Sequence, residues 1–326
     1  MKITELKNNL AVQIDDFDIK DITPENAKKI NDITKDRTVV VIKKQDRTSA
    51  TFAHFVSLLG PICNWTQFNF DPVTGEEIYK DSDLRDQGFI EPKKWDNPNT
   101  YPVQRVSQQK IKGKRAGIFN EGILDWHGNL NGLKRADCVA LQGIQYCEKT
   151  STTYLNTVKV LEEMPDDLKQ RCQDVCAEYC YTPKNWAPGL PQERSDYMAK
   201  VRPDMNHFPT PYRMWLIQEN IAGKRGIYFY TNNDCKIITN DSKLYDDLYD
   251  FTFQEKYMYQ HFYEVGDIVL CDQLLSLHKR DQNDPELLAK RALHRITYRL
   301  SNIDVNNPWI EKYNKGCSIE ETEPVQ

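Results

Sequence analysis

The feature that most constrains the fold of this chain is a succession of short strand patterns separated by turn residues. Runs rich in β-branched and aromatic side chains recur along most of the 326 residues, and long helical patterns are few. One such run, Thr38–Ile42, is β-branched throughout and bounded by charged residues, which predicts a buried strand. Many short strands with few long helices are typical of a sandwich or barrel. The sequence therefore predicts a mainly β fold of the jelly-roll kind, with flanking helices.

The order of the expected elements follows from hydrophobic periodicity and from residues that start or stop helices. Thr23 and Pro24 are a typical helix start, with the threonine as N-cap and the proline at the first helical position. A second helix is expected to end at Gly60 and Pro61. Strands are expected at residues 1–18 (one or two), 38–42, 138–146, 152–156, 213–218, 226–230, 268–271 and 291–300, and helices after Thr23 and at 49–59, 157–177 and 242–255.

We expect residues 1–326 to form a single domain. Within it, residues 64–105 lose all periodicity but are rich in aromatic residues, proline, aspartate and asparagine. A connection of this length inside a compact domain is usually either functional or disordered. We interpret it as a lid on the substrate side, and residues 307–326 as a polar tail.

Composition and charge narrow the class of partner. The chain is 39% hydrophobic and 11% aromatic, which is enough for a sizeable core, and its net charge of −5 does not favour a nucleic-acid groove. It shows neither a signal-peptide pattern nor an apolar run that could span a bilayer. We therefore expect a cytoplasmic protein with reduced cysteines and a small-molecule substrate. No nucleic-acid or membrane partner is expected, and a homo-oligomer is left open.

The residues that say most about function are in the stretch Asp125-Trp126-His127-Gly128-Asn129 and at His278. A histidine followed two positions later by a carboxylate, together with a distant histidine, forms an open-faced iron site. Three coordination positions then remain for cosubstrate and oxygen. Here Asn129 stands where the pattern has aspartate, so the third protein ligand is doubtful.

Several segments resemble, in order, those of the taurine dioxygenase family of iron(II)/2-oxoglutarate-dependent oxygenases. Residues 125–129 resemble the family's Trp-His-x-Asp motif, with Asn129 as the departure. Residues 266–272 are similar to its Gly-Asp-x-x-x-Trp-Asp run, which leads to the distal histidine, here His278. Residues 291–295 resemble its closing Arg-x-x-His-Arg. The resemblance extends over most of the chain, including the N-terminal helix and strand.

The resemblance implies a double-stranded β-helix in which His127 and His278 bind Fe(II). Asn129 would be the third ligand if its amide coordinates. It also implies that 2-oxoglutarate is the cosubstrate, that O2 is the oxidant, and that these three side chains form the catalytic centre.

The same resemblance implies how the organic ligands are held. Arg291 would bind the far carboxylate of 2-oxoglutarate, helped by Thr152, with Thr153 as the competing register. A guanidinium meets a carboxylate as a planar fork, which suits that role. In relatives that act on sulfonates, the arginine at the position of Arg295 binds the anion of the substrate. Two arginines on one inner strand face are costly to bury unless anions meet them, so we expect an anionic substrate.

Three accounts of Asn129 remain open. In the first, the amide or a water fills the position and the enzyme hydroxylates a C–H bond of a small polar or anionic molecule such as an amino acid. In the second, the missing carboxylate leaves room for a halide, as in related halogenases. In the third, the chain is a non-catalytic jelly roll that binds a small molecule. The first account is the function that we predict.

Overall fold

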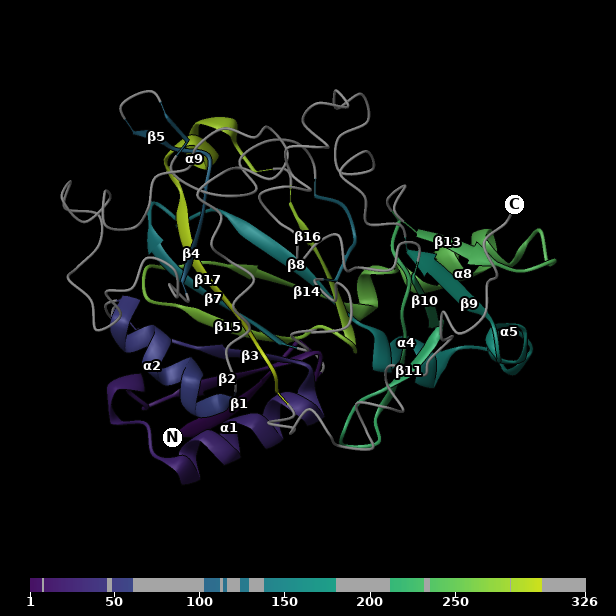
Figure 1. The fold of residues 1–326 in the computed structure, drawn as a ribbon, viewed down its shortest axis with the longest axis horizontal. Helices are drawn as coiled ribbons and strands as arrows, with labels where there is room; N and C mark the ends of the chain where they lie inside the picture. Colours follow the sequence, from purple (N-terminus) through teal and green to yellow (C-terminus); the bar gives the residue numbers. More distant parts are fainter. Residues whose placement is uncertain are drawn as a thin grey trace.

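The computed structural model describes residues 1–7, 9–45, 49–60, 103–111, 114–115, 124–128, 138–179, 212–231, 235–281 and 283–300. Two sheets form the centre of the described part (Figure 1). The large sheet has the order β1 (Lys2–Leu6), β2 (Ala11–Asp15), β3 (Val39–Ile42), β15 (Ile268–Asp272), β7 (Cys138–Gln145), β17 (Ala292–Tyr298) and β4 (Gln104–Ser107). The small sheet has the order β14 (Met258–Phe262), β8 (Ser151–Asn156) and β16 (Ser276–Arg280). The prediction of a mainly β jelly roll is confirmed.

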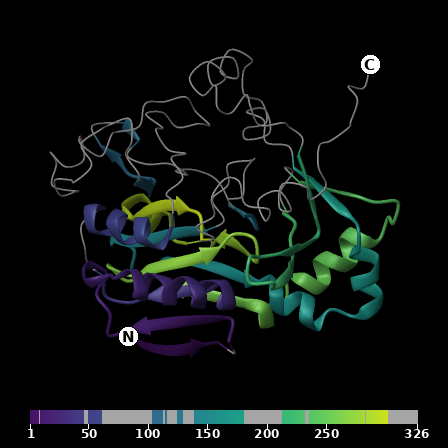
Figure 2. The same ribbon diagram turned by 60° about the horizontal axis from the view of Figure 1, so that its bottom comes forward.

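The other described elements flank these sheets. Helices α1 (Pro24–Arg37) and α2 (Ser49–Leu59) lie on one side of the molecule, and α4 (Thr157–Glu163), α5 (Asp166–Cys172) and α8 (Leu244–Thr252) on the other (Figures 1 and 2). The remaining elements are η1 (Ile19–Asp21), η3 (Glu255–Tyr257), α9 (Pro285–Lys290), the sheet of β10 (Tyr212–Trp215), β9 (Cys176–Tyr179) and β13 (Cys235–Ile238), and the pairs β11 (Ile217–Glu219) with β12 (Arg225–Ile227) and β5 (Lys110–Ile111) with β6 (Lys114–Arg115). No helix in the described ranges is long and apolar enough to cross a membrane.

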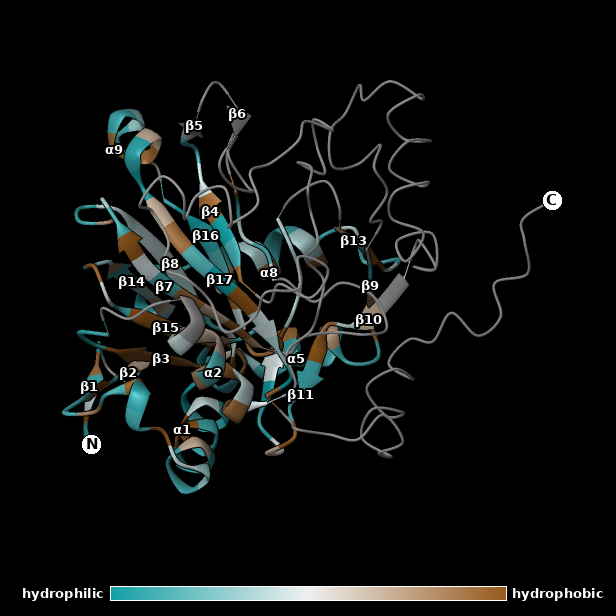
Figure 3. Ribbon diagram, turned by 60° about the vertical axis from the view of Figure 1, so that its left-hand side comes forward, coloured by the Kyte–Doolittle hydropathy of each residue, from teal (hydrophilic) through white to brown (hydrophobic). Residues whose placement is uncertain are grey.

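Helix α1 begins where the sequence predicts. The Thr23 hydroxyl accepts a hydrogen bond from the Asn26 backbone N–H at 3.2 Å, and Pro24 occupies the first turn. Ala27 and Ile30 are buried against the large sheet, while the opposite face of the helix is hydrophilic (Figure 3). This amphipathic packing is what fixes the helix, because burial of one apolar stripe outweighs its modest intrinsic propensity.

Strand β3 is apolar at every position because both of its faces are covered. Val40 and Ile42 pack with the core under α1 and α2. Val39 and Val41 face the space between the two sheets. A strand buried on both sides has no polar face, which explains the continuous run in the sequence.

Two predicted boundaries are wrong. The helical segment expected over 157–177, with a turn at Pro165, is indeed divided there into α4 and α5, but it ends at Cys172. It ends early because Asp174 takes a positive φ of 58° and the chain then enters β9 between two partner strands. The expected lid, 64–105, includes Gln104 and Arg105, which instead belong to β4 and pair with β17. All four residues of β4 are buried although three of them are polar, so the sequence shows no alternation of apolar and polar residues there. Val103, just before β4, is buried in the same core as α2. Residues 64–102 and the tail at 307–326 lie outside the described residues.

The prediction of reduced cysteines holds in part. Cys138, Cys147, Cys172, Cys235 and Cys271 are free thiols. Cys176, at the start of β9, is instead disulfide-bonded, and its partner lies outside the described residues. Residue spacing could not reveal this bond, because a disulfide depends on which segments the fold brings together.

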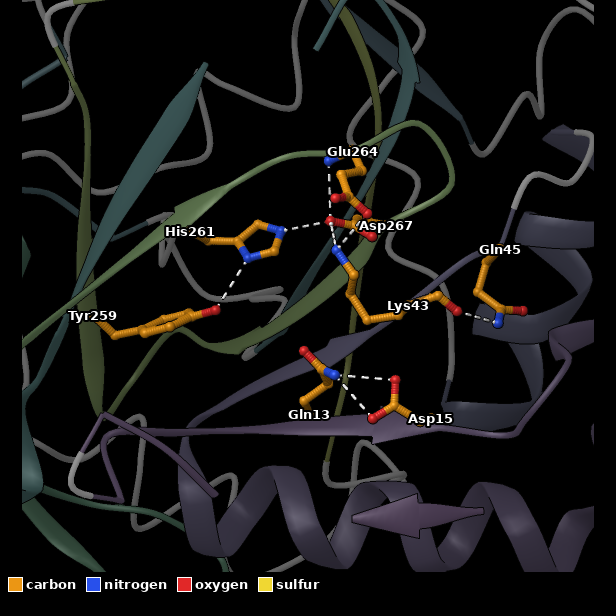
Figure 4. Close-up of polar contacts among 8 residues, drawn as sticks. All are labelled: Gln13, Asp15, Lys43, Gln45, Tyr259, His261, Glu264 and Asp267. Carbon is orange, nitrogen blue, oxygen red and sulfur yellow. Dashed lines mark hydrogen bonds and ion pairs between the residues drawn. The ribbon is translucent and has the colours of Figure 1, made fainter. Parts of the chain in front are cut away.

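A buried ion network ties the turn before β15 to the end of β3 (Figure 4). The Asp267 carboxylate lies 2.8 Å from Lys43 Nζ and 3.1 Å from His261 Nε2, and it accepts the Glu264 backbone N–H at 3.0 Å. His261 Nδ1 lies 3.1 Å from the Tyr259 hydroxyl. Although burial alone would raise the pKa of Asp267, hydrogen bonds from His261 and Lys43 hold it below its usual value.

We expect Asp267→Asn to lower the free energy of unfolding by about 3 kcal/mol, because it removes one partner of a buried ion pair. Glu264→Gln is the matched control. Its carboxylate also contacts Lys43 but is 66% exposed, so the loss should stay below about 1 kcal/mol. Urea unfolding at pH 7 measures both, and equal losses would contradict the assignment.

The same pair predicts a pH dependence. The folded-state pKa of Asp267 lies below the unfolded value of 3.8, so the unfolded chain binds the proton more readily. The stability contributed by its charge is complete above that value and is lost as the pH falls through the folded pKa. The difference between wild type and Asp267→Asn should therefore shrink in acid.

Candidate active site

The fold brings together His127 and His278, which are 151 positions apart in the sequence. Their backbones form an isolated antiparallel bridge, with His127 N–H donating to His278 O at 3.0 Å and His278 N–H donating to His127 O at 2.9 Å. The two ring centroids are 4.3 Å apart. Residues 124–128 therefore lie along the edge of the small sheet, next to β16.

Both imidazoles are suited to bind a metal in their neutral form. His127 Nδ1 lies 2.6 Å from the Asp125 carbonyl oxygen, which can only accept, so Nδ1 carries the proton and Nε2 keeps its lone pair. Burial lowers the pKa of His127, and the nearby Arg295 and Arg280 lower it further. Burial, then His127 and Arg295, lower the pKa of His278 well below its usual value.

The two histidines open onto a pocket of about 60 Å³ between the two sheets. Its apolar walls come from strands of the large sheet and from Leu124 beside β16, and its polar lining comes from histidine, threonine and arginine. The described lining residues are Val106, Leu124, His127, Val139, Leu141, Thr152, His278, Arg280, Arg291, Leu293 and Arg295. None of these described residues is acidic, so the pocket carries an excess of positive charge.

Of the two threonine registers, the structure brings Thr152 to the pocket. The Thr153 hydroxyl points to the other face of β8 and donates to the Asp281 carboxylate at 2.7 Å. Successive side chains of a strand face opposite ways, so only one of the two can line the cavity.

Arg291 lies where α9 ends and just before β17 begins. Its backbone N–H donates to Leu287 O at 2.9 Å, and its carbonyl accepts the Ser107 hydroxyl at 2.8 Å. The side chain is only 4% exposed, and its Nη1 has no hydrogen-bond partner among the described residues. Burial lowers the pKa of this guanidinium. A buried cation with an unused donor is the expected state of an anion-binding group.

Arg295 lies four residues, or two pleat repeats, beyond Arg291 and on the same strand face, as the sequence predicts. It donates to Gln104 Oε1 on β4. Sequence reasoning missed Arg280, the last residue of β16. Its position two residues after His278 was the available signal, since alternate residues of a strand share a face. Burial and the charge of Arg291 lower the Arg280 pKa to about 10, so it remains charged at neutral pH.

Asn129 lies outside the described residues, but the backbone just before it is held firmly. The Tyr230 hydroxyl donates to Gly128 O at 2.6 Å, and the Tyr228 hydroxyl lies 2.6 Å from that of Tyr230. A Cβ atom on Gly128 would come within 2.7 Å of the Tyr228 hydroxyl. Only glycine fits here without displacement, which accounts for the residue between His127 and Asn129.

A jelly roll with two converging histidines and a buried arginine is the arrangement expected of a 2-oxoglutarate-dependent oxygenase. Residues 2–297 match the family described as "Taurine catabolism dioxygenase TauD, TfdA family". The chain therefore belongs to the TauD/TfdA family of dioxygenases. As a member of it, the protein is an enzyme that depends on a metal and on 2-oxoglutarate.

Individual relatives are distant. Pentalenolactone F synthase from Streptomyces avermitilis is 21% identical over 210 residues, which cover 60% of this chain and 67% of that protein. The structure of AAD-2 in complex with Mn(II) and N-oxalylglycine is similar with a TM-score of 0.63 at 16% identity, covering 91% of this chain and 96% of that one. A taurine dioxygenase from Burkholderia xenovorans gives a TM-score of 0.62 at 14% identity, with coverage of 91% and 90%. These structures share the fold.

The described residues fit a metal and a dicarboxylate cosubstrate. Two neutral imidazoles face one pocket, and a buried guanidinium with an unused donor lies in the same lining. In the described part of the chain, no three His, Cys, Asp or Glu side chains are grouped to hold a metal ion. The imidazole pair is therefore the protein's strong donor set there.

We expect Gly128→Ala to lower the free energy of unfolding by about 1–3 kcal/mol, because the added methyl overlaps the Tyr228 hydroxyl. The shift of residue 128 should also displace His127 and weaken Mn(II) binding. In the double variant Gly128→Ala with Tyr228→Phe, removal of the hydroxyl should restore part of both losses. Thermal unfolding measures the loss of stability, and calorimetric Mn(II) titration measures the loss of metal affinity. If the losses in the double variant equalled the sum of those in the two single variants, the assigned contact would be contradicted.

Proposed function

We propose that the protein is an Fe(II)/2-oxoglutarate-dependent hydroxylase that acts on a C–H bond of a small anionic molecule such as an amino acid. The observation that carries the proposal is the convergence of His127, Thr152, His278, Arg291 and Arg295 on one pocket. These five residues come from separate segments of the chain. The local sequence predicts only that Arg291 and Arg295 share a strand face, and it does not predict that the five residues meet.

In this proposal the imidazoles of His127 and His278 would hold the iron, His127 through the Nε2 that its Nδ1 contact to Asp125 O leaves unprotonated, and Asn129 or a water would complete the set of ligands. When bound, iron and 2-oxoglutarate supply the oxidising chemistry: O2 and 2-oxoglutarate are consumed, and succinate, CO2 and hydroxylated substrate are released.

The remaining work falls to this chain's own residues. Arg291 and Thr152 orient the cosubstrate by holding its far carboxylate. Val139, Leu141 and Leu293 form the apolar wall that excludes water from the reacting centre. Arg295, held by Gln104, binds the anionic group of the substrate and fixes which C–H bond approaches the metal.

The lining of the pocket also supports a second candidate function. The pocket has three arginines and no acidic residue among its described lining, so it favours an additional anion. With Asn129 in place of a carboxylate ligand, that anion could be a halide bound to the metal. This observation supports halogenation of a similar small substrate as the alternative reaction.

We expect His127→Ala and His278→Ala each to abolish anaerobic Fe(II) binding, because these two imidazoles are the strong metal ligands among the described residues of the pocket. The measurement is the visible charge-transfer band that forms when 2-oxoglutarate chelates the iron. His54→Ala on α2, remote from the pocket, is the control and should keep the band. A band retained in either of the two site variants would remove that histidine from the metal site.

Asn129→Asp separates the two reactions. For a hydroxylase, the added carboxylate should tighten Fe(II) binding and keep or raise turnover. For a halogenase, the same carboxylate would occupy the halide position and repel it, leaving hydroxylation at best. Product mass over a panel of amino acids, with chloride and with chloride replaced by sulfate, measures the outcome. A chlorinated product from the wild type alone would overturn hydroxylation as the native reaction.

A further inference from the structure

Arg280 is the arginine of the pocket for which the proposed function has no role. Its Cα pairs with that of Thr152 across β16 and β8, so the two side chains leave neighbouring strands on the same face. Its backbone N–H donates to Leu124 O at 3.0 Å. The backbone of Arg280 is therefore held from both sides, and its side chain lines the pocket next to Thr152.

The residues around Arg280 fix this orientation. Lys279 points to the other face, where its ammonium lies 4.9 Å from the centre of the Trp126 ring. Asp281 accepts the hydroxyls of Ser151 and Thr153, each at 2.7 Å, and both of these flank Thr152 on the outer face of β8. A rotation of the strand end that withdrew Arg280 from the pocket would break these contacts.

Arg280 and Arg291 reach the pocket from opposite sides. Arg280 comes from the small sheet, and Arg291 comes from the entry to β17 in the large sheet. Arg291 is close enough for its charge to lower the pKa of Arg280, and Arg291 keeps an Nη1 donor without a partner in the described residues. Two cations that share a partly dehydrated pocket are stabilised best by an anion that contacts both.

A carboxylate can serve both arginines. Its two oxygens offer about four acceptor sites, which suffice for two guanidinium groups and one hydroxyl. Thr152, the residue opposite Arg280, is the hydroxyl already proposed to meet the far carboxylate of 2-oxoglutarate. We infer that Arg280 and Arg291 together clamp that carboxylate, one from each sheet. The inference rests on the proposed function, and it makes the enzyme strongly selective for a 2-oxo acid with a second carboxylate.

The test compares two ligands on the Mn(II)-loaded protein by calorimetry. One is 2-oxoglutarate, and the other is 2-oxopentanoate, in which a methyl group replaces the far carboxylate. Arg280→Gln should weaken 2-oxoglutarate binding about tenfold to a hundredfold, the range for a charge-assisted hydrogen bond, and leave 2-oxopentanoate binding unchanged. Arg280→Lys, which keeps the charge but loses the fork, should show an intermediate loss. Lys279→Gln, one residue away on the other face, is the matched control and should bind both ligands as the wild type does.

Equal 2-oxoglutarate affinity in Arg280→Gln and wild type would overturn the inference while leaving the proposed function intact. An equal loss for both ligands in Arg280→Gln and in Arg280→Lys would also overturn it, because it would show a structural role for Arg280. Absence of Mn(II)-dependent binding of 2-oxoglutarate by the wild type would refute the proposed function itself, and the inference with it.

Discussion

Strand β16 is paired on both sides, and the site depends on this double pairing. On one side it runs antiparallel to β8 from Ser276 to Arg280, and on the other it exchanges two hydrogen bonds with His127. The pairing sets the separation of the two imidazoles and places Arg280 opposite Thr152. Because the side-chain period of a strand is two, a slip of one residue would turn His278 out of the pocket.

The second constraint is charge. The described lining of the pocket combines two imidazoles with three arginines, and the motif has an amide at Asn129 in place of a carboxylate. Apolar residues of the large sheet surround these groups, so their charges are poorly screened by water. Such a pocket is stabilised when anions enter it. The pocket therefore favours an anionic cosubstrate, and it also favours a second anion, which is either the substrate or a halide.

Much of the fold could be predicted from local pattern. The Thr23-Pro24 helix start and the Val39–Ile42 strand depend on neighbouring residues in the sequence, and both predictions were confirmed. The segment at 157–177 could not be predicted, because Cys176–Tyr179 becomes a strand only through its partners β10 and β13. Arg105 on β4 was not predicted for a similar reason: its buried side chain hydrogen-bonds to the half-buried Gln109 and Gln145, and such polar contacts do not show in hydrophobic periodicity.

The sequence by itself determined which chemistry is present: two histidines in a spaced motif, the asparagine two residues after the first, and two arginines four residues apart. Residue types and short-range spacing suffice for this, because motifs of ligands and strand parity are local properties. Only the tertiary structure decided that Thr152 rather than Thr153 enters the pocket, and that Arg280 joins Arg291 there. Those facts depend on the register of β8 against β16 and on the packing of one sheet against the other, which are set by contacts between residues far apart in the chain.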